Sequence, residues 1–481
     1  MEVKPPVVVI LGHIDHGKST LIDYIRKTNL TAKEAGGITQ SIGAYQVSLG
    51  KNKAITVIDT PGHEAFEKMR SHGARAADIA VLVIAADEGV KPQTVEAIKD
   101  IKEAKLPFIV ALNKIDKPEA NARKVKEELI QYEVFVEGFG GDTPALEISA
   151  KTGKGIKELL DLIVLMAEVQ ELTADSLAPA KGVVITSSLD SQRGVSATLM
   201  VKDGTLKVGQ WIRLETTFGK VRAMHNFEGK LVKEAPPSSP VMMLGLEGLP
   251  GVGETFRAVV SQEEAGQDIL PARETLVIDK VTAGEKNLTF ILKAKEKASL
   301  DALSKLFSQV QTQHADIKLQ IISKGVGDVS VSDIETADRF GALIVGFNVK
   351  IPSIVRPAMA HREVNIKIFS VIYELPKLVS ELIAQQFASQ TQAAQKGELA
   401  VLGVFSKSKE GQVIGGKAVK AVIKKGMTLN IKRDEEIIGK GKIINLQHLK
   451  KDVTVVEAGK ECGILFQGDE VKVGDVLIEA F

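Results

Sequence analysis

The sequence predicts a multidomain chain with α/β and β parts: an α/β domain, a β-barrel, a small α/β domain, a long linker helix and a second β-barrel. Three observations lead to this fold class. A glycine-rich loop near the amino end stands between an apolar run and a helical pattern. Two separate regions hold short alternating strands without helices between them. A polar stretch with helical spacing joins the second of these regions to the rest.

Composition narrows the class of protein. At 481 residues the chain is too long for one ordinary domain, and its hydrophobic fraction of 44% supports packed cores. Cys462 is the only cysteine, which excludes an internal disulfide and a cysteine-rich metal site and fits a cytoplasmic setting. We expect no membrane span, because no apolar stretch approaches about 18 residues. Residues 1–6 are too short and too polar for a secretory signal.

The first domain, residues 1–170, begins with a nucleotide-binding pattern. The apolar, β-branched residues 7–11 predict a buried strand, and Gly12-His13-Ile14-Asp15-His16-Gly17-Lys18-Ser19 follows at once. Residues 20–25 continue with helical spacing, which completes the strand, loop and helix of a phosphate-binding P-loop. Lys18 is then placed to reach β and γ phosphates, and the Ser19 hydroxyl to bind Mg²⁺. The competing interpretation is a glycine-rich turn with an exposed lysine.

Three more segments follow in the order typical of a P-loop GTPase domain. Asp59-Thr60-Pro61-Gly62 ends a second apolar strand, and the Gly62 N–H is suited to sense a γ-phosphate. Asn113-Lys114-Ile115-Asp116 ends a third, where a carboxylate can accept two hydrogen bonds from guanine that adenine cannot donate. Ser149-Ala150-Lys151 offers a backbone N–H to the guanine O6. For the last two segments, solvated turns are the alternative.

These segments give a set of candidate site residues. The expected contacts to GTP or GDP come from Asp15, His16, Gly17, Lys18, Ser19, Thr20, Gly62, Asn113, Lys114, Asp116, Ser149, Ala150 and Lys151. The expected Mg²⁺ site uses Ser19, Thr39 when GTP is bound, and Asp59 in the outer coordination sphere.

Two further side chains have competing interpretations. His63 follows Gly62 and can orient the attacking water as a catalytic residue, or be a solvated turn histidine. Asp15 can help to hold a monovalent cation beside the phosphates, or be a local turn carboxylate. We interpret His13 and His16 as loop residues whose side chains do no chemistry.

The middle of the chain divides into a β region and an α/β region. Residues 171–265 predict a small β-barrel from strands at 182–186, 195–201 and 206–212. Residues 270–372 predict an α/β layer, with strands at 287–293, 317–323 and 341–349, a helix at 297–310, and a capping box at Ser332–Glu335.

The carboxyl-terminal part combines a linker and a second barrel. Residues 373–397 predict a linker helix whose second half has no apolar face beyond alanine, with a flexible linker as the alternative. Residues 398–481 repeat the barrel pattern. Within them, residues 407–451 hold twelve Lys/Arg against four Asp/Glu, a charge of +8, and residues 452–481 hold two against seven, a charge of −5. A basic face suits a phosphate-rich partner, although a solvated surface is the alternative.

Taken together, these residues resemble bacterial translation initiation factor two over nearly the whole chain. The likeness rests on the segments 12–19, Glu-Ala-Gly-Gly-Ile-Thr-Gln at 34–40, 59–66, Gly-Val-Gly at 325–327, 344–349 and Glu-Cys-Gly at 461–463. The resemblance implies a GTPase that brings formylmethionyl initiator tRNA to the small ribosomal subunit and promotes joining of the large one. The ribosome would then stimulate hydrolysis, with His63 in the catalytic position. We expect a monomer.

The resemblance also implies a tRNA pocket in the last barrel, around Glu461, Cys462 and Gly463. Arg433, Lys450 and Lys451 would supply phosphate contacts, although family members carry a basic and aromatic cluster that residues 447–450 only partly match. A buried core position for Cys462 is the alternative. The long amino-terminal extension of many members is nearly absent. Two other functions compete: an elongation-type or specialised tRNA-delivery GTPase, and a non-ribosomal regulatory GTPase.

Overall fold

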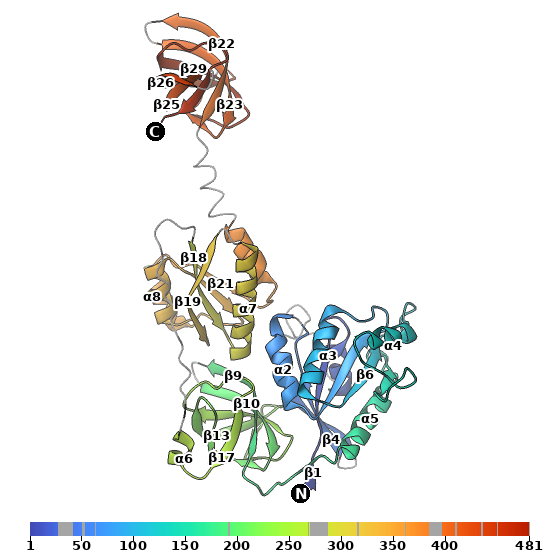
Figure 1. Cartoon of the computed structure of the whole chain (residues 1–481). Helices are drawn as coiled ribbons and strands as arrows, with labels where there is room; N and C mark the ends of the chain where they lie inside the picture. The colour runs from blue at the N-terminus through green and yellow to red at the C-terminus, as the bar shows by residue number, and fades with distance from the viewer. Residues whose placement is uncertain are drawn as a thin grey trace. The chain divides into compact units, whose positions relative to one another are not determined.

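A computed structural model of the chain divides into two compact units, residues 1–376 and 377–481, and each is described by itself (Figure 1). The structure describes residues 1–26, 42–50, 53–62, 64–190, 193–267, 269, 287–314, 317–360, 362–383, 397–408, 411–433, 436–449 and 451–480. Among these residues, no helix is both long and apolar enough to cross a membrane.

The first unit opens with a six-stranded sheet in the order β3-β4-β2-β5-β6-β7. All its pairs are parallel except β3 with β4. The sheet consists of β2 (Val7–Gly12), β3 (Gly43–Gly50), β4 (Lys53–Asp59), β5 (Ile79–Ala85), β6 (Phe108–Asn113) and β7 (Ala145–Glu147). Strand β5 is apolar and buried at every position, as expected for a parallel strand covered on both faces.

Helices flank this sheet (Figure 1). They are α1 (Lys18–Arg26), α2 (Glu67–Ala76), which follows a short 3₁₀ turn (Glu64–Phe66), α3 (Pro92–Ala104), α4 (Ala122–Ile130) and α5 (Ile156–Val169). Leu21 of α1 and Leu159 and Ile163 of α5 join the strand side chains in one core. Because the P-loop runs from β2 into α1, this core fixes both ends of the loop.

A closed β-barrel follows. Its strands run in the order β12-β17-β9-β10-β16-β13, and β12 pairs with β13 to close it. The strands are β9 (Lys181–Asp190), β10 (Gly194–Asp203), β12 (Trp211–Arg213), β13 (Phe218–Asn226), β16 (Pro240–Leu246) and β17 (Thr255–Val259). Short outer pieces are β1 (Glu2–Val3) with β8 (Thr173–Ala174), β14 (Leu231–Val232), and β11 (Leu206–Lys207) with β15 (Glu234–Ala235). Helix α6 (Gln262–Gly266) ends this part.

One sequence prediction here is wrong. Residues 206–212 do not form a single strand, because β11 and β12 belong to different sheets. The turn between them contains Gly209, whose φ of 96° lies in the left-handed region that favours glycine.

The last part of the first unit is a parallel α/β layer with the strand order β19-β18-β20-β21. Its elements are β18 (Asn287–Ala294), α7 (Lys297–Gln313), β19 (Lys318–Val326), α8 (Val331–Phe340), β20 (Leu343–Phe347), a 3₁₀ turn (Ser353–Val355), α9 (Arg356–Met359) and β21 (Ile366–Phe369). The predicted capping box is misplaced by two residues. Ser330, not Ser332, caps α8, since its hydroxyl accepts from the Asp333 N–H while the Asp333 carboxylate accepts from the Ser330 N–H.

The second unit holds the other closed barrel, with the strand order β25-β30-β22-β23-β29-β26 and closure between β25 and β26. Its elements are β22 (Glu398–Ser408), β23 (Gly411–Lys420), β24 (Ile423–Lys424), β25 (Thr428–Arg433), β26 (Glu436–His448), β27 (Lys451–Asp452), β28 (Val455–Val456), β29 (Glu461–Gly468) and β30 (Val476–Glu479). Strand for strand, this order matches the first barrel, as the repeated sequence pattern suggested. Of the expected linker helix, residues 374–383 are helical and residues 384–396 lie outside the described part.

Candidate nucleotide-binding site

The P-loop contains two positions at which only glycine fits, because any side chain there would collide with neighbouring atoms. Gly12 has φ 143°, and a Cβ there would meet the Val83 carbonyl oxygen at 2.3 Å. Gly17 has φ 88°, and its Cβ would meet the Asn113 Nδ2 atom at 2.3 Å. Helix α1 starts at Lys18, so the first N–H groups of the helix face the loop. The arrangement suits an anion held by backbone donors.

The side chain of Lys18 folds back against the backbone of this loop. Its side chain is buried, and Nζ donates to the His13 carbonyl oxygen at 2.6 Å. Burial lowers the pKa of Lys18 to about 8, although the carboxylate of Asp59 acts in the opposite direction. A bound phosphate would give this ammonium a stronger acceptor than the carbonyl it now meets.

The end of β4 comes close to the same loop. Asp59 is buried there, and the Thr60 hydroxyl donates to the Ile10 carbonyl oxygen at 3.0 Å. A Cβ on Gly62 would lie 2.6 Å from the Nζ atom of Lys18, so the Gly62 backbone approaches the position expected for a terminal phosphate. Ser19 at the start of α1 and Asp59 are the oxygen donors that Mg²⁺ prefers, and they fit that ion.

A buried arginine behind this turn was not found from the sequence. Arg70 of α2 is fully buried, and its Nη1 donates to the Gly62 carbonyl oxygen at 3.2 Å. Its guanidinium also pairs with Glu96 of α3, and with Asp100 at 3.6 Å. Burial raises the pKa of Asp100 to about 6, although Arg70 acts to lower it. Nothing in the local sequence signals these contacts, because they join three separate elements.

The segments expected to bind the base meet at the opposite end of the P-loop. Asn113 donates through Nδ2 to the His16 carbonyl oxygen at 2.8 Å and accepts through Oδ1 from the Ala150 N–H at 2.9 Å. The Ser149 hydroxyl donates to the Asp116 Oδ1 atom at 2.6 Å. This hydrogen bond lowers the pKa of Asp116, so a charged carboxylate stands on the surface where a guanine edge would lie.

The remaining expected residues fall into four groups: paired, exposed, buried, and outside the described residues. Lys114 pairs with Glu88 at 2.9 Å, which holds the turn after β6. Three residues are exposed: Asp15 on the loop, Thr20 in the first turn of α1 and Lys151 beside Ala150. The His16 ring is fully buried and its pKa is lowered to about 3, mainly by burial, which agrees with a side chain that does no chemistry. His63 and Thr39 lie outside the described residues.

The candidate tRNA residues of the last barrel separate by face. On strand β29, the side chains of Cys462, Ile464 and Phe466 point into the core of the barrel, whereas Glu461 is exposed. Cys462 is 6% exposed and burial raises the pKa of its thiol to about 11, which favours the alternative of a buried core position over a direct part in the expected tRNA pocket. Successive side chains of a strand point to opposite faces, so Cys462 faces the barrel core while its neighbour Glu461 faces solvent.

The accessible feature of the segment is Gly463. A Cβ there would have no atom within 4 Å. Gly463 pairs with Gly415 of β23, which pairs with Gly403 of β22, so three glycines form a row across the barrel. We call these residues the glycine row.

Two of the expected cations differ in their surroundings. Arg433 donates to both carboxylate oxygens of Asp475, at 2.7 and 2.8 Å, which makes it part of a structural ion pair rather than the open phosphate contact expected. Lys451 is exposed. Lys450 lies outside the described residues.

Comparison with known proteins gives matches along the whole chain. Family models match residues 4–169 (elongation factor Tu GTP binding domain), 179–259 (elongation factor G domain 2) and 271–380 (translation-initiation factor 2). The translation initiation factor IF-2 of Persephonella marina is 42% identical over 99% of this chain and 56% of its own length. That of Thermodesulfovibrio yellowstonii is 41% identical over 99% and 65%.

Solved structures also match. GDP-bound aIF5B from Aeropyrum pernix has a TM-score of 0.49 and 26% identity, over 99% of this chain and 92% of that one. The chain spans between about half and two thirds of the length of the curated relatives named above.

Proposed function

The chain belongs to the translation initiation factor IF-2 family, and from this premise we propose that it is a GTPase that acts when the ribosome starts translation. Its proposed partners are initiator formylmethionyl tRNA and both ribosomal subunits, and its proposed setting is the cytoplasm, where it acts as a monomer. The observation that carries the proposal is the joining of three sequence-distant segments into one site, through the Asn113 bonds to His16 and Ala150 and the Ser149 bond to Asp116.

In the proposed reaction the chain binds GTP with Mg²⁺ and hydrolyses it to GDP and phosphate. Lys18 and the N–H groups of the P-loop hold the phosphates, while Asp116 selects guanine. Mg²⁺, when bound, neutralises charge on the phosphate oxygens, and Ser19, Thr39 and Asp59 are its proposed holders. A monovalent cation beside Asp15 belongs to the same proposal.

Two neighbouring residues have roles at the terminal phosphate in this proposal. Gly62 senses the terminal phosphate through its N–H, and His63 orients the attacking water. Arg70 donates to the Gly62 carbonyl oxygen and also pairs with two acids of α3. These contacts support the proposal, because they hold the turn at Gly62 in a fixed position against that helix.

The last barrel is the proposed binding site for the acceptor end of initiator tRNA. The glycine row supports this at Gly463, where no atom lies within 4 Å of a Cβ position and a ligand can approach the backbone, whereas the Phe405 ring lies over Gly403 and Gly415. Phe405 is 76% exposed beside that row, and an exposed aromatic ring can stack on a base. Glu461 and Lys451 remain candidates for polar contacts there, whereas Arg433 is bound to Asp475.

Ribosome-stimulated GTP hydrolysis tests the proposal. Phosphate release by the full chain should rise when both ribosomal subunits and initiator tRNA are added. Lys18→Ala should lose this activity, whereas Lys99→Ala should keep it, because Lys99 is exposed and, among the described residues, its ion pair is with Glu103 of its own helix. Hydrolysis that is indifferent to ribosomes would instead support a regulatory GTPase with protein partners.

A further inference from the structure

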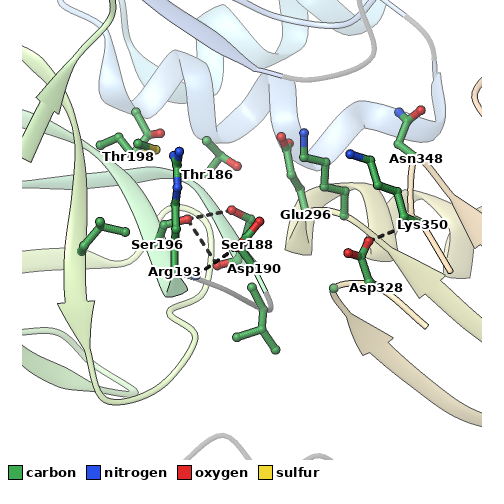
Figure 2. A pocket seen from close by; sticks show the side chains of 15 residues that line it. Thr186, Ser188, Asp190, Arg193, Ser196, Thr198, Glu296, Asp328, Asn348 and Lys350 are labelled. Carbon is green, nitrogen blue, oxygen red and sulfur yellow. Dashed lines mark hydrogen bonds between the residues drawn. The ribbon is translucent and has the colours of Figure 1, made fainter. Parts of the chain in front are cut away.

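A second cavity of about 380 Å³ lies outside the nucleotide site, between the first barrel and the parallel α/β layer (Figure 2). Its volume is in the range of pockets that hold small molecules. One wall comes from β9 and β10 of the barrel, and the other from loops at the edge of the α/β layer. The two walls touch at an antiparallel bridge between Ser188 and Glu296.

The strand order places this cavity where parallel sheets bind ligands. The chain runs from β18 through α7 to β19 on one side, then through α8 to β20 on the other side of β18. Crossovers in opposite directions put α7 and α8 on opposite faces, as Figure 1 shows. The connections therefore diverge at the carboxyl end of β18, and such a switch point is the usual ligand crevice of an open α/β sheet.

The lining residues occupy that edge. Lys295 and Glu296 directly follow β18, Gly327 and Asp328 follow β19, and Lys350 comes shortly after β20. Gly327 has φ 104° and its N–H donates to the Ala294 carbonyl oxygen at 2.8 Å, which draws the two loops together. All three carboxyl ends thus open into one cavity.

Three cationic side chains, Arg193, Lys295 and Lys350, line the cavity together with three acids, Asp190, Glu296 and Asp328. In the described part of the chain, no ion pair joins the side chains of Arg193, Lys295 or Lys350 to a carboxylate. Asp328 instead accepts from the Lys350 N–H at 2.8 Å, so it serves as a loop brace. In Figure 2, Arg193 stands on the barrel side with the hydroxyls of Thr186 and Ser188, facing Lys350 across the cavity.

The amino end of helix α7 adds positive electrostatic potential to the cavity. It begins at Lys297, directly after Glu296, and no side chain caps its first N–H groups. Those groups and the positive end of the helix favour an anion. Within the described residues, the Glu296 Oε2 atom is buried without a hydrogen-bond partner. Burial raises the pKa of Glu296, although the charge of Lys295 and a hydrogen bond with Thr186 act to lower it, and in its protonated form this acid can donate to a ligand oxygen.

We propose that this cavity binds a small phosphate-bearing molecule, with Lys295, Lys350 and Arg193 contacting its phosphate and the hydroxyls of Thr186 and Ser196 contacting its polar body. Because residues of both the barrel and the α/β layer line the site, the ligand would also fix the angle between them. This activity is separate from the proposed GTPase function and does not depend on it.

The test uses the full chain saturated with GDP and Mg²⁺, so that the P-loop does not compete. Ribose 5-phosphate and pyrophosphate are titrated by calorimetry, each against the matching chloride salt. We expect saturable one-to-one binding of at least one of them. The variant Lys295→Ala/Lys350→Ala should weaken it by about tenfold or more, because hydrogen bonds from charged donors are lost.

Lys318→Ala is the matched control. Lys318 is exposed at the start of β19, at the opposite edge of the same sheet, so its loss should change affinity less than twofold. An equal loss in both variants would mean general charge attraction and would overturn the proposal. Absence of binding at millimolar phosphate ligand, or binding of an RNA oligonucleotide alone, would overturn it as well.

Discussion

Asp116 is the residue on which base selection should depend. Its carboxylate is exposed, charged and oriented by the Ser149 hydroxyl at 2.6 Å. Its two acceptor oxygens match the N1 and N2 donors of guanine, which adenine does not offer.

Asp116→Asn should therefore shift preference from guanine toward xanthine nucleotides, because the amide presents a donor where the carboxylate accepted. Competition binding with GTP, ATP and XTP measures this shift. Ser149→Ala is a companion variant that keeps the carboxylate and should lower GTP affinity only modestly. If the unaltered chain binds ATP as well as GTP, the assignment of Asp116 is wrong.

His63 is the residue on which hydrolysis should depend. His63→Ala should lower ribosome-stimulated turnover by roughly 10²-fold or more, in line with the loss of a water-positioning group. GTP affinity should stay within a few-fold, since binding uses Lys18 and the P-loop backbone. Equilibrium binding and single-turnover hydrolysis on the same preparation separate the two effects, and an unchanged rate would make His63 an ordinary turn residue.

At the scale of single elements, strand β29 separates a core face from an open face. Cys462 belongs to the core face and is the sole cysteine, which makes its reactivity a clean measure of that orientation. At pH 8 a thiol of pKa about 11 holds about 100-fold less thiolate than one of pKa 9, so alkylation should slow by at least that factor.

Unfolding in denaturant should restore the rate of an ordinary thiol. Folding raises the pKa of the Cys462 thiol. Ionisation of this thiol therefore leaves the stability of the fold unchanged below pH 9 and lowers it as the pH rises from about 9 to 11. Rapid alkylation of the folded chain at pH 8 would contradict the core position and return Cys462 to the surface.

The open face of β29 gives a complementary prediction. Gly463→Trp should block tRNA binding, because the added ring would fill the glycine row that an acceptor end is proposed to occupy. Since no atom lies within 4 Å of a Cβ at this position, stability should change by about 0.5 kcal/mol or less. Gly463→Ala is the mild control. Retained tRNA binding in the tryptophan variant, with an unchanged melting temperature, would remove the row from the site.

The elements also show what local patterns can and cannot predict. The P-loop, Asp59 and the Asn113–Asp116 turn follow apolar strands directly, so their place at one sheet edge was predictable from order alone. Arg70 was not, because its partners come from the turn at Gly62 and from α3. The cap of α8 was misplaced since Ser330 and Ser332 both stand near an acid, and only backbone geometry separates them.

For the whole molecule, the division into two units predicts separable activities. A chain truncated after Gln395 should lose initiator-tRNA binding and keep nucleotide binding, because the P-loop and its core lie wholly in residues 1–376. Protection of the aminoacyl ester from hydrolysis measures the first activity, and fluorescent GDP binding measures the second. Equal protection by the truncated and full chains would show that the last barrel is not the tRNA site.

The proposed GTP switch that places initiator tRNA on the ribosome can be tested by retention of tRNA on the small subunit. Labelled formylmethionyl initiator tRNA and an elongator aminoacyl-tRNA are each incubated with small subunits, messenger RNA, the full chain and GTP. The proposed function predicts GTP-dependent retention of the initiator tRNA alone, reduced when GDP replaces GTP. Equal retention of the elongator tRNA, or retention indifferent to the nucleotide, would contradict it.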